Sequence, residues 1–143
     1  MIVVDTSAVM AVLLNEPTSG AVIQCLADNE LCMSAGTLSE LLIVTATREL
    51  SAEADELLEA IGAEIKIVDG LIAKGVQQAY QKWGKGRHKA SLNFGDCFAY
   101  ATAKAGEMPL LFVGDDFTHT DLEPAIQNGY VDKKLLCQPF ILK

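Results

Sequence analysis

Short apolar runs alternate with longer helical stretches along this chain, and this alternation limits the fold most strongly. Residues 2–5 read Ile-Val-Val-Asp, and such a β-branched run is typical of a strand buried on both faces. Further strands are expected at residues 31–33, 65–68 and 110–113, and a short one near residues 136–141. Strands separated by helices form parallel sheets with helices on both faces. The chain is therefore expected to be an α/β protein, a three-layer α/β/α sandwich around a central parallel sheet.

Residues between the expected strands follow a helical period. Leu57, Leu58 and Ile61, for example, alternate with charged residues at a spacing that places apolar side chains on one helix face. Helices are expected at residues 6–15, from behind Pro17 to residue 29, and at residues 37–49, 51–61, 70–83 and 95–105. The length of 143 residues fits one domain, residues 1–143, and no repeat or linker divides it.

Composition limits the partners of this domain. The formal net charge is −8, whereas proteins that bind nucleic acid over a wide surface usually carry a net positive charge. Any contact with nucleic acid is therefore expected to be local. Half of the residues are hydrophobic, which is a high proportion for a small domain and predicts that a partner covers apolar surface. A homodimer is the simplest such assembly.

The sequence predicts a cytoplasmic protein without a membrane span. The longest apolar run, residues 8–14, is far shorter than the roughly 20 residues that cross a bilayer. The first residues lack the basic segment and cleavage site of a secretory signal. Cysteines stay reduced in the cytoplasm. We expect all four to be small core residues rather than zinc ligands: Cys25, Cys32, Cys97 and Cys137.

Acidic residues gather near one edge of the expected sheet. Asp5 ends the first strand, Glu40 lies in the opening turn of the helix after the second strand, and Asp96 begins a later helix. Asp115 and Asp116 directly follow the late apolar strand. The carboxyl ends of parallel strands share one edge, and ligands of such sheets bind there. These acids are therefore expected to face a common site.

Each acid taken alone also has a structural explanation. Asp5 can cap the helix after it, and Asp96 can favour the positive end of its own helix. Thr37 and Glu40 have the spacing of a capping box, and the two acids after the late strand can be turn residues. Together, however, several like charges at one edge raise one another's pKa and need a cation. Such oxygen ligands favour Mg²⁺ or Mn²⁺, and ions held in this way hydrolyse phosphodiesters.

Four short motifs, in this order, resemble those of PIN-domain proteins, and more narrowly of VapC-type toxins from bacterial toxin–antitoxin pairs. They read DTSA, TLSELL, LNFGDCFAYA and LLFVGDDFTHTDL, and they extend over almost the whole chain. The resemblance implies an α/β/α sandwich and a metal-dependent endoribonuclease that leaves a 3′ hydroxyl and a 5′ phosphate. It also implies a small cognate antitoxin of VapB type, which would cover the acidic pocket.

Carried over by position, the resemblance assigns the site residues. Asp5, Glu40 and Asp96 match the first three acids of the family. Asp116, directly before Phe117, is the better match for the fourth, and Asp115 is either an outer ligand or a surface residue. Polar positions that match family residues supporting the site through hydrogen bonds are Thr6, Ser7, Thr120 and Asp121, for which capping and turn formation is the alternative.

A basic segment directly precedes the helix of Asp96. It reads KWGKGRHK and contains no acid, so it could bind RNA phosphates and direct a strand to the metals. Trp83 or His88 could stack on a base. The alternative is a solvated loop after a helix end that favours cations. The candidate RNA-binding residues are Lys82, Lys85, Arg87, His88 and Lys89.

Other functions are compatible with an acid at the end of the first strand. A phosphatase of the haloacid-dehalogenase type needs a second Asp two residues later, where this chain has Ser7. A phospho-accepting receiver domain pairs its acids after the first strand, whereas here the pair follows the late strand. A PIN-like module that binds RNA or a partner without cleavage would have lost an acid, and all four positions are acidic here.

Overall fold

The computed structural model describes residues 1–126, and its strands form one parallel sheet. The strands are β1 (Ile2–Val4), β2 (Leu31–Ser34), β3 (Glu64–Lys66) and β4 (Leu110–Leu111). They are ordered β3-β2-β1-β4 across the sheet, and each neighbouring pair is parallel. The chain thus adds β2 and β3 on one side of β1 and β4 on the other, so the strand order reverses between β1 and β4. Open parallel sheets bind their ligands beyond the carboxyl ends of the strands at such a point.

The helices lie close to their expected positions. They are α1 (Thr6–Leu13), α2 (Ser19–Asp28), α3 (Ala35–Thr47), α4 (Ser51–Ile61), α5 (Gly70–Trp83) and α6 (Phe94–Gly106), followed by the short 3-10 helix η1 (Asp116–His119). The start of α3 differs from the expected residue 37. Ser34 caps this helix, because its hydroxyl accepts a hydrogen bond of 3.2 Å from the Gly36 amide. The strand expected near residues 136–141 lies outside the described residues.

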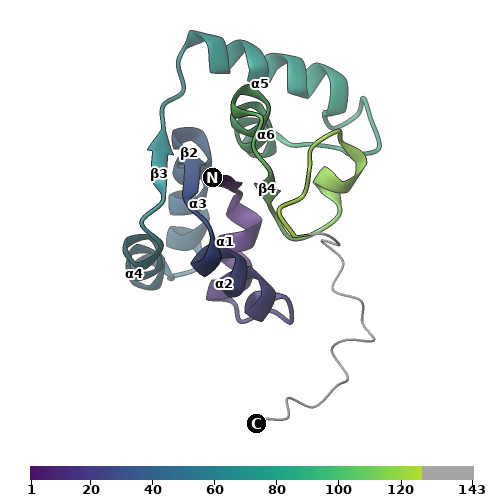
Figure 1. Ribbon diagram of the computed structural model, residues 1–143. Helices are drawn as coiled ribbons and strands as arrows, with labels where there is room; N and C mark the ends of the chain where they lie inside the picture. Colours follow the sequence, from purple (N-terminus) through teal and green to yellow (C-terminus); the bar gives the residue numbers. More distant parts are fainter. Residues whose placement is uncertain (127–143) are drawn as a thin grey trace.

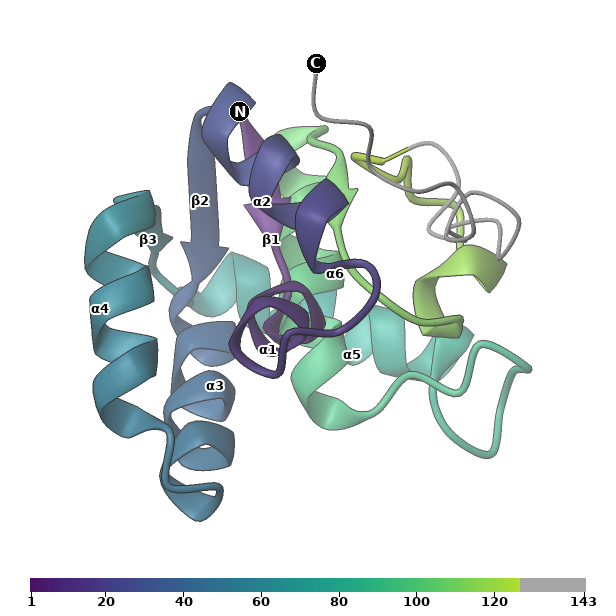
Figure 2. The same ribbon diagram turned by 90° about the horizontal axis from the view of Figure 1, so that it is seen from below.

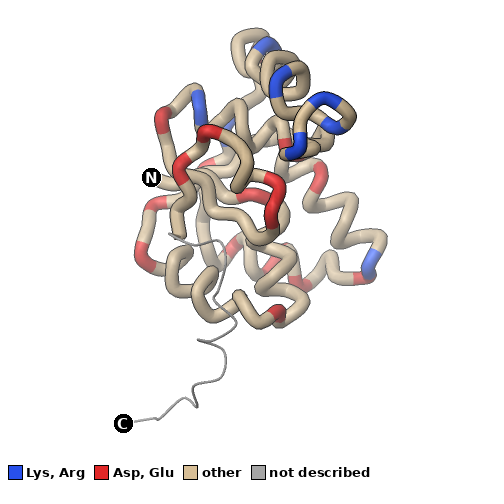
Figure 3. Tube along the Cα trace, turned by 90° about the vertical axis from the view of Figure 1, so that its right-hand side faces the viewer, with Lys and Arg blue, Asp and Glu red and all other residues tan. Residues whose placement is uncertain are grey.

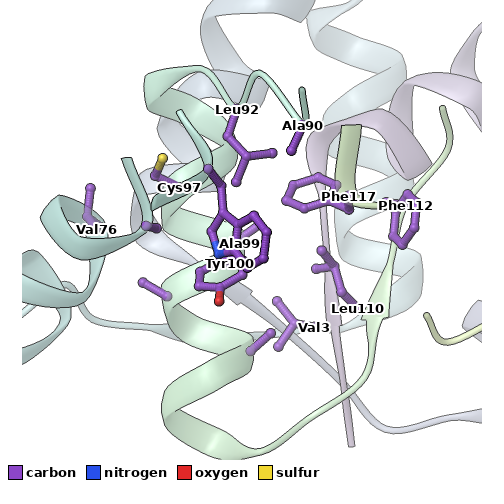
Figure 4. Packing of buried hydrophobic residues seen from close by; sticks show 14 of the residues in the cluster. Val3, Val76, Ala90, Leu92, Cys97, Ala99, Tyr100, Leu110, Phe112 and Phe117 are labelled. Atoms are coloured by element: carbon purple, nitrogen blue, oxygen red, sulfur yellow. The ribbon is translucent and has the colours of Figure 1, made fainter. Parts of the chain in front are cut away.

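Alternate residues of β1, β2 and β4 enter two separate cores, one on each face of the sheet. Val3, Cys32 and Leu110 pack with α5 and α6, and Figure 4 shows part of this cluster around Tyr100. The next residues along the same strands, such as Val4 and Met33, pack with α1, α2, α3 and α4. The three-layer sandwich is therefore confirmed, and Figures 1 and 2 show the two groups of helices.

Burial differs between the strands. Ile2–Val4 and Leu31–Ser34 are buried throughout, as the apolar runs predict, whereas the edge strand β3 is largely exposed. Cys32 and Cys97 are fully buried core residues, as expected, and Cys25 is half-buried. No helix within the described part of the chain is long and apolar enough to cross a bilayer.

Candidate active site

Four carboxylates come together where the carboxyl ends of β1 and β4 meet α3 and α6. Asp5 follows β1, Asp116 follows β4, Glu40 lies on α3 and Asp96 lies on α6. Their charges interact: that of Glu40 raises the pKa of Asp5, and those of Asp5, Asp116 and Glu40 raise the pKa of Asp96. The four acids expected at one edge therefore lie within electrostatic reach of one another.

Asp5 is buried, with 3% of its surface exposed, and its two carboxylate oxygens differ in role. Oδ2 caps α1 by accepting hydrogen bonds from the Ser7 amide at 3.0 Å and from the Ser7 hydroxyl at 2.6 Å. Oδ1 is buried and has no hydrogen-bond partner within residues 1–126. Burial is the main cause that raises the pKa of Asp5 from 3.8 to about 6. Capping thus explains one oxygen of Asp5 and leaves the other available.

Ser7 and Thr6 connect the end of β1 to neighbouring segments. The Ser7 hydroxyl donates to Asp5 and also accepts a hydrogen bond of 3.0 Å from the Val113 amide, just after β4. The Thr6 hydroxyl donates a long hydrogen bond of 3.5 Å to the carbonyl of Thr37 in α3. Both residues therefore hold together the elements that carry the acids.

Asp96 combines a capping role with a strongly shifted pKa. It is 8% exposed and forms a capping box with Asn93, in which each side chain accepts from the other residue's amide, at 3.0 and 2.8 Å. Burial is the main cause that raises its pKa from 3.8 to about 7, and the three neighbouring carboxylates add to the effect. The carboxylate is thus fixed in place yet costly to ionise without a cation.

Glu40 does not cap its helix. Because Ser34 is the cap of α3, Thr37 occupies the third helical position and Glu40 lies in the second turn, not in the opening one. The capping-box explanation for Glu40 is therefore wrong. Instead, the Glu40 carboxylate lies against Gly95 of α6, where the Cβ of any other residue would overlap it. This close approach places Glu40 next to the first turn of α6 and Asp96.

The Gly95→Ala variant tests this contact. The added methyl group would displace the Glu40 carboxylate, so the metal-ligand role that the resemblance implies for Glu40 predicts a fall in RNA cleavage of about 10-fold or more. Gly20→Ala, at a position with no heavy atom within 4 Å of the added Cβ, is the matched control. Equal cleavage rates for the two variants would show that the position of Glu40 does not matter.

The last acids lie on the short segment after β4. Gly114 has a φ of +105°, which favours glycine, and it reverses the chain before the exposed Asp115 and Asp116. Of these two acids, Asp116 and not Asp115 is among the charges that raise the pKa of Asp96. The hydroxyl of Thr120 bonds to the carbonyl of Phe117 at 2.7 Å, so it stabilises the local turn. The side chain of Asp121 accepts hydrogen bonds from Tyr100 and Lys104 of α6.

These carboxylates suit a cation in donor type, although the side chains do not enclose one directly. Among residues 1–126, no three His, Cys, Asp or Glu side chains are grouped closely enough to hold a metal ion together. The buried Oδ1 of Asp5 has no hydrogen-bond partner within residues 1–126, and burial with neighbouring carboxylates raises the pKa of Asp96, so a cation would stabilise both groups. Oxygen donors of this kind bind Mg²⁺ and Mn²⁺.

Lysine and arginine positions crowd at one end of the molecule, where α5 leads into residues 84–93 (Figure 3). Lys82, Lys85, Arg87 and Lys89 are exposed. His88 is half-buried, accepts a hydrogen bond of 3.0 Å from the Ala90 amide, and packs edge-on against Trp83. Trp83 itself is only 9% exposed and belongs to the core, so the expectation that it stacks on a base is wrong.

The structure reveals an exposed aromatic residue that the sequence reading missed. Phe94, the first residue of α6, is 68% exposed, and its ring contacts Phe98 edge-on with 4.9 Å between centroids. The ring of Phe98 in turn lies against Gly36 of α3. The available signal was an aromatic residue two positions before an acid of the site, at a helix start.

Comparisons with known proteins agree with this architecture. The family model described as PIN domain matches residues 2–123. VapC ribonuclease Mb2004c from Mycobacterium bovis is 44% identical over 85% of this chain and 91% of its own length. Ribonuclease VapC from Mycolicibacterium smegmatis is 40% identical over 84% of this chain and 96% of its own.

Two solved structures share the fold at low sequence identity. A toxin–antitoxin complex from Klebsiella pneumoniae matches with a TM-score of 0.66 and 16% identity, over 91% of this chain and 98% of that chain. Mycobacterium tuberculosis VapC20, described as a sarcin-ricin loop cleaving toxin, matches with a TM-score of 0.69 and 14% identity, over 85% and 96%. The parallel sheet, its acidic edge and these sequence similarities show that this chain belongs to the PIN-domain family, among the VapC ribonucleases.

Proposed function

We propose that this protein is a Mg²⁺- or Mn²⁺-dependent endoribonuclease, the toxin of a toxin–antitoxin pair. The observation that carries the proposal is the group of four interacting carboxylates, two of which are buried and have raised pKa values. Relatives at 40 to 44% identity are named ribonucleases. The combination of acids fits hydrolysis of the RNA phosphodiester.

Asp5, Glu40, Asp96 and Asp116 would hold the metal, with Asp115 as an outer ligand. A divalent ion supplies a more acidic bound water and stabilises charge on the phosphate and leaving oxygen. The protein's own part is orientation: Ser7 and Asn93 each fix one acid through hydrogen bonds, and Gly95 admits Glu40. Asp5 and Asp96 are buried, whereas Asp115 and Asp116 are exposed, so this edge of the sheet is open to solvent and RNA on the side of β4.

The direct test is controlled expression of the chain beside its Asp96→Asn variant, followed by sequencing of the RNA ends that appear. The proposal expects growth arrest and new 5′-phosphate ends with the unchanged chain only. Identical cuts with both proteins would remove Asp96 from the mechanism. Growth arrest without new ends from the unchanged chain would favour a PIN-like module that binds RNA or a partner without cleavage.

Exposed cations of the basic segment are proposed to bind the RNA backbone. Neutralising both Lys85 and Arg87 should weaken RNA binding and reduce the slope of log K against log salt by about 1 to 2, because each phosphate contact releases counterions. Lys66, which is paired with Glu64 at 2.9 Å, is the control position. An unchanged slope, measured by fluorescence anisotropy, would contradict the role of this segment.

Phe94 is proposed to take the stacking role that Trp83 does not have. Its ring is exposed, lies in the same helical turn as Asp96 and is held by Phe98, so a base near the cleaved bond could stack on it. We expect Phe94→Ala to raise KM for RNA by about 5- to 100-fold, since such stacking contributes about 1–3 kcal/mol, while Phe94→Tyr retains binding. Equal KM values for the two variants would exclude stacking.

The protein's partners are also proposals. A toxin–antitoxin complex is among the structures that share this fold, and we propose that a small antitoxin of VapB type covers the acidic site, with an Arg bound between its carboxylates.

A homodimer would bury the exposed apolar residues Ile65, Ile67 and Leu71. Sedimentation of the free toxin measures this state. A cytoplasmic location is proposed as well; within residues 1–126 no disulfide joins Cys25, Cys32 or Cys97.

A further inference from the structure

One face of α6 lies near the segment after β4. Asp96, Tyr100 and Lys104 are spaced by four residues, so their side chains line the same face of the helix. Asp116 acts electrostatically on Asp96 at one end of this face. At the other end the Asp121 carboxylate accepts hydrogen bonds from the Tyr100 hydroxyl at 2.6 Å and from the Lys104 ammonium at 3.1 Å. The segment therefore lies along α6.

The Asp121 contact favours a charged carboxylate. Asp121 is stabilised in its charged form, because the Tyr100 hydrogen bond and then Lys104 lower its pKa. Burial and this hydrogen bond raise the pKa of Tyr100 to about 12, so the hydroxyl stays protonated at neutral pH. The end of the segment that carries Asp121 is therefore held to α6 by a hydrogen bond and an ion pair.

The chain between Asp116 and Asp121 is short and contains its own backbone hydrogen bonds. The amide of Thr118 donates to the carbonyl of Asp115, and the amide of Thr120 donates to the carbonyl of Phe117, both at 3.1 Å. The Phe117 ring is buried in the core with Tyr100, and its centroid lies 5.2 Å from that of Phe112. The buried ring and these backbone bonds therefore fix the shape of the segment that carries both Asp116 and Asp121.

We propose that Tyr100 and Lys104, acting through Asp121, are positioning residues that hold Asp116 opposite Asp96 before a metal ion binds. This role rests on the metal site proposed above. It assigns a function to Tyr100, Lys104 and Asp121, which form hydrogen bonds with one another within the described residues rather than with the four carboxylates. It also explains why a tyrosine hydroxyl and an ion pair lie on the same helix face as the acid.

Binding of Mn²⁺ to the RNA-free protein, followed by electron paramagnetic resonance, tests the proposal without any activity measurement. Tyr100→Phe and Asp121→Asn should weaken Mn²⁺ binding by about 10-fold, as is usual for groups that orient metal ligands. Lys104→Arg should preserve it. Tyr80→Phe, which removes the same hydroxyl from an exposed tyrosine of α5, is the matched control. Circular dichroism identifies any variant that fails to fold, and the remaining one then carries the test.

Hydrogen exchange gives a second readout in the metal-free state. The amides of residues 116–120 should exchange faster in Tyr100→Phe and Asp121→Asn than in Tyr80→Phe. Unchanged Mn²⁺ affinity and unchanged exchange would overturn the positioning role while leaving the proposed function intact. If the unchanged protein binds no Mn²⁺, the metal site is wrong and the positioning role is rejected with it.

Discussion

Replacing Asp5 with Asn is expected to abolish RNA cleavage and, in the absence of metal, to stabilise the protein. Loss of a carboxylate that is proposed to bind the metal should reduce the cleavage rate by about 100-fold or more. The amide oxygen of Asn can still accept the Ser7 hydrogen bonds that cap α1. Asn carries no charge, so the variant avoids the free-energy cost of burying an ionised carboxylate, which is the cost that raises the pKa of Asp5. The free energy of unfolding at neutral pH should therefore rise by about 1 to 3 kcal/mol.

Activity and stability are measured on the same preparations, by cleavage of labelled RNA and by denaturant unfolding with EDTA. Asp5→Ala is the informative comparison, because it also removes the carboxylate but leaves the Ser7 amide without its cap. We expect Asp5→Ala to be equally inactive and less stable than Asp5→Asn by about 1 kcal/mol. A loss of stability in Asp5→Asn itself would mean that the carboxylate contributes more to the fold than its pKa indicates.

Metal-free protein is expected to become less stable as the pH rises from about 5 to about 8. Asp5 and Asp96 have folded-state pKa values of about 6 and about 7, above the ordinary 3.8. The folded state therefore binds more protons than the unfolded state within this range, and its advantage is lost as the pH rises through 6 and 7. Saturating Mg²⁺ should reverse the trend, because it binds the ionised carboxylates.

Thermal unfolding at a series of pH values, with EDTA and then with Mg²⁺, provides the measurement. The Asp96→Asn variant should show a flatter profile in EDTA, because one of the two shifted groups is removed. If stability in EDTA instead increased toward pH 8, burial of the charged Asp5 and Asp96 would not destabilise the folded protein, and the prediction would be wrong. If Mg²⁺ raised the unfolding temperature equally at pH 5 and pH 8, the ion would bind at a place other than Asp5 and Asp96.

Local sequence signals were enough for the sheet and for the general location of the acids. Asp5 and Asp116 follow strands whose apolar runs are unmistakable, so their edge of the sheet could be predicted. The helix start near residue 37, on which the alternative capping explanation of Glu40 depends, is wrong, because Ser34 at the end of β2 provides the cap. A single serine at a strand end is a weak signal until the strand itself is known.

Contacts between distant segments could not be predicted in this way. Trp83 occurs in a basic, polar stretch, and only the packing of α5 against α6 buries its ring. Asp121 was grouped with the acidic site on resemblance, while in the structure it contacts a tyrosine and a lysine 21 and 17 residues earlier in the chain. Which side chain meets which across two helices depends on their crossing, which one sequence does not specify.

The capping roles of Asp5 and Asp96 affect how such a toxin can be lost by mutation. Each carboxylate uses one oxygen to begin a helix, and an asparagine amide can provide that oxygen equally well. Aspartate and asparagine codons differ by a single base. One transition at either position should therefore yield a protein that remains folded and accumulates in the cell, although it has lost a carboxylate of the proposed metal site.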